Sequence, residues 1–379
     1  MNNSTQKLYT QFDQGINWNA FLYIIQKSLT TILTFALFYK LSPTDFSVWA
    51  NVNSIIFLVL LWLDFGFRKS IPKYIPEFSK DIRSHLLFTK FIIAFQLSLL
   101  CIFFLIFTFY HKSILGIASL TLSSSVLYLA LVIFVLEAFI ALLKLIYHAH
   151  FWNREFNLFY SIIITAESVI CGLLLFYINN SFYLLVSIMF IKVISGIITN
   201  IVAISGLRQL YLNKQYQDIN QVNYKLLKTE FVKHSAIMWG NTTLKSLTER
   251  NFIFPILTLT IGVELANVFK IANDWALLFQ RSIVKTIGTT DTLLFSQINE
   301  LNNESVMNEA FQKICSKIRR LCIPLFGILI ILLFLKNYFI NKNELIFKIF
   351  ILLVISYLIE SILSPYERVL EVKRRLARF

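Results

Sequence analysis

The sequence predicts an all-α, polytopic integral membrane protein with about ten transmembrane helices, on the basis of its composition and its apolar segments. Hydrophobic residues make up 57% of the 379 residues, charged residues make up 15%, and the mean hydropathy is +0.67. A soluble domain carries about 25% charged residues, so this chain could not cover a surface that faces water. With 37 Phe but only 10 Gly and 6 Pro, the composition also excludes disordered, collagen-like and linker-repeat proteins.

The apolar segments give the positions of the expected helices, because about 20 mostly apolar residues cross ~30 Å of hydrocarbon. They are 17–39, 46–66, 86–110, 117–147, 157–178, 182–206, 231–260, 263–296, 319–336 and 345–364. The first lacks the short apolar core and the cleavage site of a secretory signal, so we expect it to be retained as a span. Segments 231–260 and 263–296 are unusually polar.

Positive charge is distributed unevenly between the two sides of the predicted bundle. One side consists of the N-terminal lead, the connections after spans two, four, six and eight, and the tail, and it holds 21 Lys and Arg. The connections on the opposite side hold four: Lys40, Lys112, Lys336 and Lys342. By the positive-inside rule, this bias predicts that both termini lie in the cytoplasm. It also accounts for the net charge of +14 without a nucleic-acid partner.

No sequence pattern indicates a cofactor, a metal site or a catalytic group. Cys101 and Cys171 fall within apolar segments, and Cys315 and Cys322 flank a basic stretch. There is no CxxC motif and no Cys/His cluster with zinc-ligand spacing. A nucleophile elbow and a Gly-rich phosphate loop are also missing, so we expect neither a disulfide framework nor an enzyme.

Segment 263–296 carries the most informative polar pattern. Five polar residues lie within an arc of about 60° on a helix, while the other faces are largely apolar. They are Asn267, Lys270, Asp274, Arg281 and Lys285. An internal ion-pair network is the simpler explanation, since Lys270 and Asp274 are four residues apart. That pairing leaves two bases unmatched, and charged residues within spans usually face a bundle interior or a wet cavity, so we favour a cavity lining.

The other spans contain further intramembrane polar residues. In 231–260, one face carries His234, Asn241, Lys245 and Glu249. The remaining candidates are Lys27 in the first span, Asn53 and Asp64 in the second, Glu137 in the fourth and Glu167 in the fifth. Four other bases, Lys90, Lys144, Lys192 and Lys348, are expected to extend toward the headgroups. These residues together predict a central cleft with both charges, in which cations are in excess.

A cationic cleft within a membrane protein suits an anionic substrate. Lys offers a flexible point charge and Arg a planar fork for phosphate oxygens. We therefore expect the bases of the cleft to bind substrate: Lys27, Lys245, Lys270, Arg281 and Lys285. The polar groups that would line the cavity or take part in ion coupling are Asn53, Asp64, Glu137, Glu167, Asn241, Glu249 and Asp274.

A weak internal repeat predicts two lobes. YKLSPTDFSVWANVNSI, after the first span, aligns with LTLTIGVELANVFKIANDW at an offset of about 219 or 220, which places Asn53 on Asn273. An even number of spans separates the copies, so they are expected to run in parallel. The expected division is an N-terminal six-helix lobe at 1–210, a cytoplasmic connection at 211–230 and a C-terminal lobe at 231–379.

These segments resemble the polysaccharide transport proteins, including O-antigen (Wzx) flippases. SPTDFSVWA, DFGFRKSIPKYIPE and TERNFIFPILTLTIGVELANVFKIANDWALLF carry the resemblance. The superfamily is that of multidrug, oligosaccharidyl-lipid and polysaccharide exporters, and it includes the multidrug and toxic-compound extrusion (MATE) transporters. The resemblance implies two helical lobes around a cationic cavity. It further implies alternating-access transfer of an undecaprenyl-diphosphate-linked oligosaccharide (an O-antigen, capsular or exopolysaccharide unit) across the bacterial inner membrane. A polymerase and chain-length machinery would be the associated proteins.

The sequence departs from the family in one respect and leaves other functions open. Family members usually have two six-helix halves, whereas six plus four spans are predicted here, so the second lobe is expected to lack its last two helices. A small-molecule or drug exporter of the same superfamily is the main alternative, although it should favour acids in the cavity. A polysaccharide polymerase or an acyltransferase is the less favoured alternative. A polymerase should have a large periplasmic loop, whereas the predicted connections on that side are short. An acyltransferase should have a His within the membrane, whereas the His residues lie mostly at the edges of predicted spans.

Overall fold

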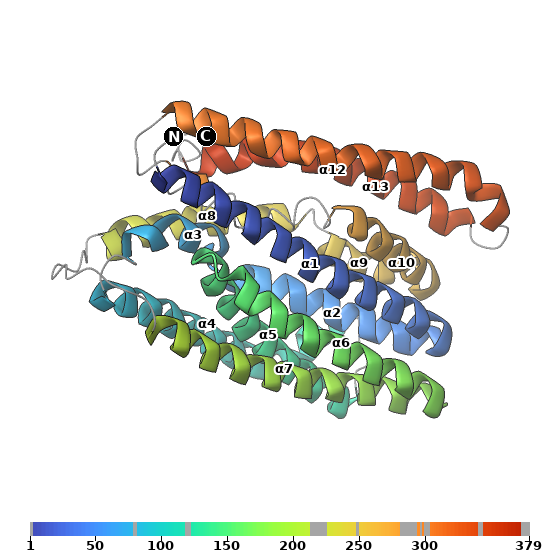
Figure 1. The fold of residues 1–379 in the computed structure, drawn as a ribbon. Helices are drawn as coiled ribbons and strands as arrows, with labels where there is room; N and C mark the ends of the chain where they lie inside the picture. The colour runs from blue at the N-terminus through green and yellow to red at the C-terminus, as the bar shows by residue number, and fades with distance from the viewer. Residues whose placement is uncertain are drawn as a thin grey trace.

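The computed structural model describes residues 3–78, 82–117, 123–212, 226–247, 250–280, 294–295, 298, 304–339 and 344–372. All regular secondary structure in these ranges is helical, as predicted (Figure 1). The first residues of α1 and the last residues of α13 lie at the same end of the bundle. The described part of the chain therefore begins and ends at the same end of the bundle.

The N-terminal part of the chain forms seven helices. They are α1 (Asn3–Lys40), α2 (Pro43–Leu63), α3 (Phe67–Phe78), α4 (Ile82–Ile117), α5 (Ser124–Ala149), α6 (Asn153–Tyr177) and α7 (Ser181–Leu212). Among the described residues, α2, α5, α6, α7 and the segment 83–107 of α4 are long and apolar enough to cross a membrane. Each of these five coincides with a predicted span.

The remaining described helices belong to the second half of the chain. They are the π-helix η1 (Leu226–Phe231), α8 (Val232–Ser246), α9 (Arg250–Thr260), α10 (Val263–Gln280), α12 (Glu304–Phe339) and α13 (Glu344–Val372). The predicted span 231–260 is divided, because α8 ends at Ser246 and α9 begins only at Arg250. Beyond α9, Gly262 adopts a positive φ of 90°, which permits the sharp reversal into α10.

Helix α3 is a local structure that hydropathy does not reveal. The stretch is basic and contains two prolines, so it has the composition of a connection rather than a span. Its apolar residues nevertheless recur at helical spacing, and Ile71, Tyr74 and Ile75 are buried. The helix packs on α5 and α8 at the end of the bundle where α2 finishes.

The helices pack in two groups, with α2 in contact with both. In the first half, α1 packs on α6, and α7 packs on α5 and α6. In the second half, α13 packs on α10 and α12. Helix α2 touches α8, α9 and α10 as well as α5 and α7, and α1 also touches α10. The expected lobe limits remain a prediction, but α2 is the described helix that connects the two groups most extensively.

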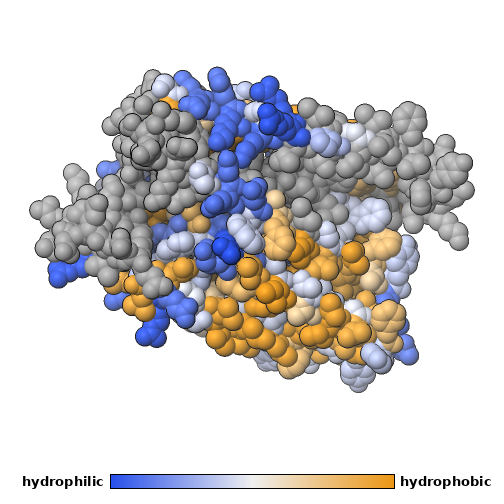
Figure 2. Space-filling view, viewed as in Figure 1, coloured by the Kyte–Doolittle hydropathy of each residue, from blue (hydrophilic) through white to orange (hydrophobic). Residues whose placement is uncertain are grey.

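The surface is consistent with a membrane environment. Apolar side chains cover the lower part of the molecule over α5, α6 and α7, while hydrophilic ones gather above, over the first part of α12 and the neighbouring part of α1 (Figure 2). Phe176, Ile162 and Ile201 are among the exposed large apolar residues of α6 and α7. Contiguous apolar surface of this kind suits contact with lipid rather than with water.

Candidate functional site

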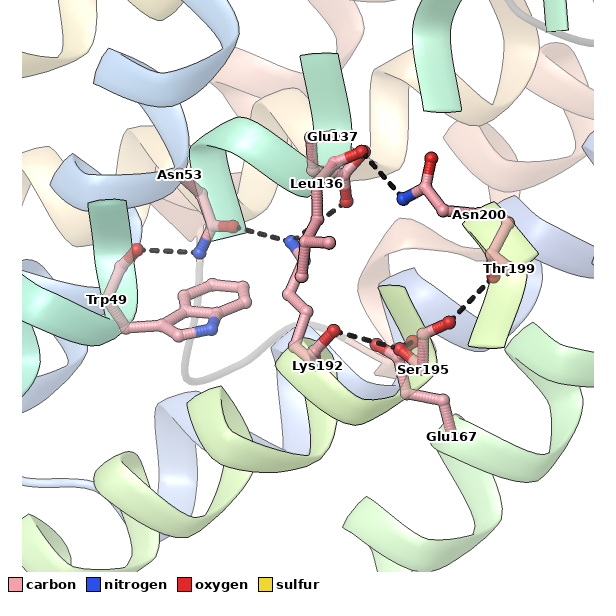
Figure 3. Close-up of polar contacts among 9 residues, drawn as sticks. All are labelled: Trp49, Asn53, Leu136, Glu137, Glu167, Lys192, Ser195, Thr199 and Asn200. Atoms are coloured by element: carbon pink, nitrogen blue, oxygen red, sulfur yellow. Dashed lines mark hydrogen bonds and ion pairs between the residues drawn. The ribbon is translucent and has the colours of Figure 1, made fainter. Parts of the chain in front are cut away.

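A cluster of polar side chains lies midway along α2, α5, α6 and α7 (Figure 3). At its centre is Lys192 on α7, whose Nζ donates a hydrogen bond to Oδ1 of Asn53 at 3.1 Å. The amide of Asn53 is oriented by its own helix, because its Nδ2 donates to the backbone carbonyl of Trp49 at 2.8 Å. This bond directs Oδ1 toward the ammonium. Two helices are thus joined by a charge-assisted hydrogen bond.

Two carboxylates complete the cluster. Glu137 on α5 lies 3.8 Å from the ammonium, measured from its Oε1 to Nζ of Lys192. Glu167 on α6 accepts a hydrogen bond from the hydroxyl of Ser195, which lies three residues after Lys192 on α7. The side chains of Lys192 and Glu137 retain 31% and 32% of their accessible surface, respectively, so the pair is not fully enclosed. Four helices therefore contribute polar groups to one place within the span region.

Close packing of α5 against α7 holds this geometry. A Cβ on Gly196 would lie 3.1 Å from Cδ1 of Leu136, so the absence of a side chain lets the two helices approach. The Nδ2 of Asn200, one turn further, donates to the backbone carbonyl of Leu136 at 3.2 Å. A small residue and an interhelical hydrogen bond thus fix the position of Lys192 relative to Glu137.

The charge balance of the cluster suggests what it does chemically. Among the described side chains, this cluster holds two carboxylates and one ammonium: Lys192 pairs with Glu137, and Glu167 is bound by the hydroxyl of Ser195. If all three groups were ionised, one negative charge would remain, and an unpaired charge in mid-membrane costs about 2.5–3.5 kcal/mol. A proton or a monovalent cation would remove this cost. The arrangement is therefore suited to binding and releasing one positive charge.

Three of the predicted polar residues, Asn53, Glu137 and Glu167, lie together in this cluster. Lys192 was instead expected to extend toward the headgroups, and it provides their connection. Its position in the middle of segment 182–206 is the feature of the sequence that could have revealed this, because snorkelling requires a position near the end of a span. Lys144 lies 5.7 Å from the ring centroid of Tyr160, in a cation–π contact.

The predicted stripe of α10 is only partly described. Lys270 and Asp274 form an ion pair with Nζ and Oδ1 3.6 Å apart, and their side chains are only 10% and 13% exposed. This ion pair between residues four apart is the one expected if the polar stripe were an internal ion-pair network, which was the simpler explanation of the stripe. Asn267 donates from Nδ2 to the backbone carbonyl of Pro43 at 3.1 Å, which attaches α10 to the start of α2.

Other predicted site residues lie elsewhere or outside the described residues. Asp64 follows the last residue of α2 and accepts a hydrogen bond from the backbone N–H of Arg68. Burial raises the pKa of the Asp64 carboxyl, against the opposing effect of the Arg68 guanidinium. Asn241 is exposed on α8. Arg281, Lys285 and Glu249 lie outside the described residues, as do the side chains of Lys27 and Lys245.

The fold is similar to that of solved MATE transporters. One is a mutant of the Vibrio cholerae MATE transporter VcmN, with a TM-score of 0.65 and 13% identity over 97% of this chain and 84% of that chain. The chain has a MATE-transporter fold. A second solved structure, a MATE in complex with MaD3S, gives a TM-score of 0.59 and 14% identity over 100% of this chain and 87% of that chain. No protein-family model and no curated protein matches the sequence.

Proposed function

We propose that this protein is a membrane exporter that works by alternating access and is driven by a cation bound at the cluster of Glu137, Glu167 and Lys192. The observation that carries the proposal is a cluster midway along the helices in which two carboxylates accompany one ammonium: Glu137 pairs with Lys192, and Glu167 is held by Ser195, three residues further along the same helix. The transporter fold supports it, because groups that bind and release charge within a membrane are characteristic of transport pathways and proton relays.

The cluster offers a physical route from cation binding to helix movement. Its polar groups come from α2, α5, α6 and α7, so a change in its charge alters the attraction among four helices. Neutralising one carboxylate removes a repulsion between Glu137 and Glu167 and leaves the other acid to pair with Lys192. A cation could therefore favour one packing of these helices over another, as required of a ligand that shifts a conformational equilibrium.

A small organic molecule is the first candidate for the exported substrate. The solved proteins of similar fold are MATE transporters, and the Lys residues of the two described polar sites, on α7 and α10, each face an acid. Lys270 is paired with Asp274, and Lys192 is paired with Glu137. A site with this balance suits a neutral or cationic compound better than a diphosphate.

A flippase for polyprenyl-diphosphate-linked oligosaccharide is the second candidate. It is supported by the sequence resemblance and by the polar stripe of segment 263–296, which continues to Arg281 and Lys285. With Asp274 paired to Lys270, the stripe holds no second acid for those two bases. Arginine and lysine there would suit the diphosphate, while the lipid tail stays in the bilayer.

The cation requirement can be tested with purified protein in liposomes. Ethidium provides the probe for organic-cation export, and a fluorescent undecaprenyl-diphosphate disaccharide provides the probe for flipping. Glu167→Gln should abolish transport driven by a proton or sodium gradient, with Glu155→Gln, at the exposed start of the same helix, as the matched control. Gradient-driven transport of either probe that is unchanged in Glu167→Gln would contradict the proposed role of the cluster. Transport of neither probe by the unmodified protein would contradict the proposed function.

A further inference from the structure

The turn between α2 and α3 is packed unusually closely against α8. Gly66 in this turn has a φ of +73°, and a Cβ at this position would lie 2.3 Å from the backbone oxygen of Ser235 and 2.8 Å from the backbone nitrogen of Trp239. No other residue fits such a backbone-to-backbone contact without displacement. The turn belongs to the N-terminal half of the chain, and α8 belongs to the C-terminal half.

Two tryptophans reinforce the same contact. The indole Nε1 of Trp239 on α8 donates to the backbone carbonyl of Trp62 at 2.6 Å. The indole of Trp62, near the end of α2, donates in turn to Oγ of Ser246 on α8 at 2.8 Å. The ring of Phe65 lies against the ring of Trp239, with centroids 5.8 Å apart. The contact is therefore specific, because both indole donors are satisfied across the junction of the two halves.

Helix α3 extends the contact along the beginning of α8. Ser70 and Nδ1 of His234 are within hydrogen-bond distance at 3.0 Å, and the ring of Tyr74 stands edge-on to the same imidazole. Phe67 stacks on Phe231, the last residue of η1. A second junction lies between α1 and α12, where Asp13 forms ion pairs with Lys313 and Lys317. Those charges are partly exposed, so the aromatic contact is the more substantial of the two.

We propose that this contact, formed by residues 62–74 with residues 231–246, is a latch that closes one end of the molecule between its two halves and opens during each transport cycle. The proposal rests on the proposed function, since only alternating access requires that end to open. The predicted orientation assigns this end to the cytoplasm. The structure accordingly represents the state with the latch closed.

The latch has features of a contact that forms and breaks. Within the described residues, the buried hydroxyls of Ser235 and Thr243 on α8 have no hydrogen-bond partner. Unpaired buried polar groups reduce the stability of a closed arrangement, and opening toward water would satisfy them. At the far end of α2, the junction with α10 contains the Asn267–Pro43 hydrogen bond, so the two halves also touch there. An alternating-access transporter opens its two ends in turn, so a helix at its pivot needs separate contacts at each end, as α2 has.

A disulfide trap tests the latch directly. In a background without the native cysteines, the pair Ser70→Cys and His234→Cys should crosslink on oxidation, and export of ethidium or of the lipid disaccharide should stop and return on reduction. The matched control is Ser42→Cys with Ser181→Cys, where the backbone N–H of Ser42 donates to the hydroxyl of Ser181 at 2.9 Å and both residues belong to the N-terminal half. This crosslink should leave transport unchanged. Undiminished transport by the crosslinked Ser70/His234 pair, or failure of that pair to crosslink, would overturn the latch.

A distance measurement separates failure of the latch from failure of the proposed function. Spin labels at Lys69 on α3 and Lys233 on α8 report the gap without any substrate, and labels at Leu86 and Arg208 serve as a pair within one half. Gly66→Ala should increase a population with longer distances for the first pair only, because the added Cβ cannot fit the closed contact. An identical single short distance in both proteins would contradict the latch, even if neither transport probe moves.

Discussion

Replacing Lys192 by Met should destabilise the protein by removing the positive charge that pairs with Glu137. The ammonium lies 3.8 Å from Oε1 of Glu137, and two unit charges at that separation attract by about 4 kcal/mol at an effective dielectric of about 20. Both side chains keep roughly a third of their surface, so solvent screening reduces this figure, and we expect a coupling of about 1–3 kcal/mol. Asn53 would also lose the donor to its Oδ1.

A double-mutant cycle measures this coupling. The free energy of unfolding is determined by SDS titration in mixed micelles for Lys192→Met, for Glu137→Gln and for the double variant. Removing both charges should cost less than the sum of the two single changes, because neither partner is then left unpaired. Lys90→Met, at an exposed position on α4, is the matched control and should change stability by less than about 0.5 kcal/mol. Additivity of the two single changes within about 0.5 kcal/mol would refute the ion pair as a stabilising contact.

Three further predictions concern packing, substrate and orientation. Gly196→Leu should destabilise the protein by about 1–3 kcal/mol or more, because its Cβ meets Leu136 at 3.1 Å; the same unfolding assay would contradict this if stability were unchanged. If the substrate is a lipid diphosphate, Arg281→Glu should abolish complementation of a flippase-deficient strain at normal protein levels, and full complementation would argue against that role. A cysteine at Asn179 should react with an impermeant maleimide from the periplasm, and one at Lys69 only after permeabilisation; the reverse pattern would invert the predicted topology.

The sequence was sufficient to predict the helical membrane fold. It did not predict the elements whose composition is unlike that of a span, such as α3. Long apolar segments must become helices in a membrane, which is why α2, α5, α6 and α7 match predicted spans. Helix α3 was treated as a connection because its burial depends on the neighbouring α5 and α8. The division of 231–260 into α8 and α9 was also missed, since hydropathy averages over such a break.

The candidate site was only partly predictable for a related reason. Helical periodicity shows which face of a helix carries a polar residue, but not which other helix lies opposite that face. Glu137, Glu167 and Asn53 were therefore identified singly, without the base that connects them. The missing fact was that α7 contacts both α2 and α6, so that Lys192 reaches Asn53 and Ser195 reaches Glu167, with close packing at Gly196 against α5.

The internal repeat adds a distinction between the two halves. Asn53 of α2 and Asn273 of α10 align in the repeat, and each uses its side-chain oxygen as an acceptor across to another helix. For Asn53 the donor is the ammonium of Lys192, whereas for Asn273 it is the phenol of the fully buried Tyr357, 2.9 Å away. A phenol carries no charge near neutral pH, so the bond to Asn273 has no group to gain or lose a proton. Among the described side chains, Asn53 contacts a charged group and Asn273 a neutral one. This difference supports our proposal that the charge-sensitive element lies on the α2 side, on the same helix that ends in the proposed latch.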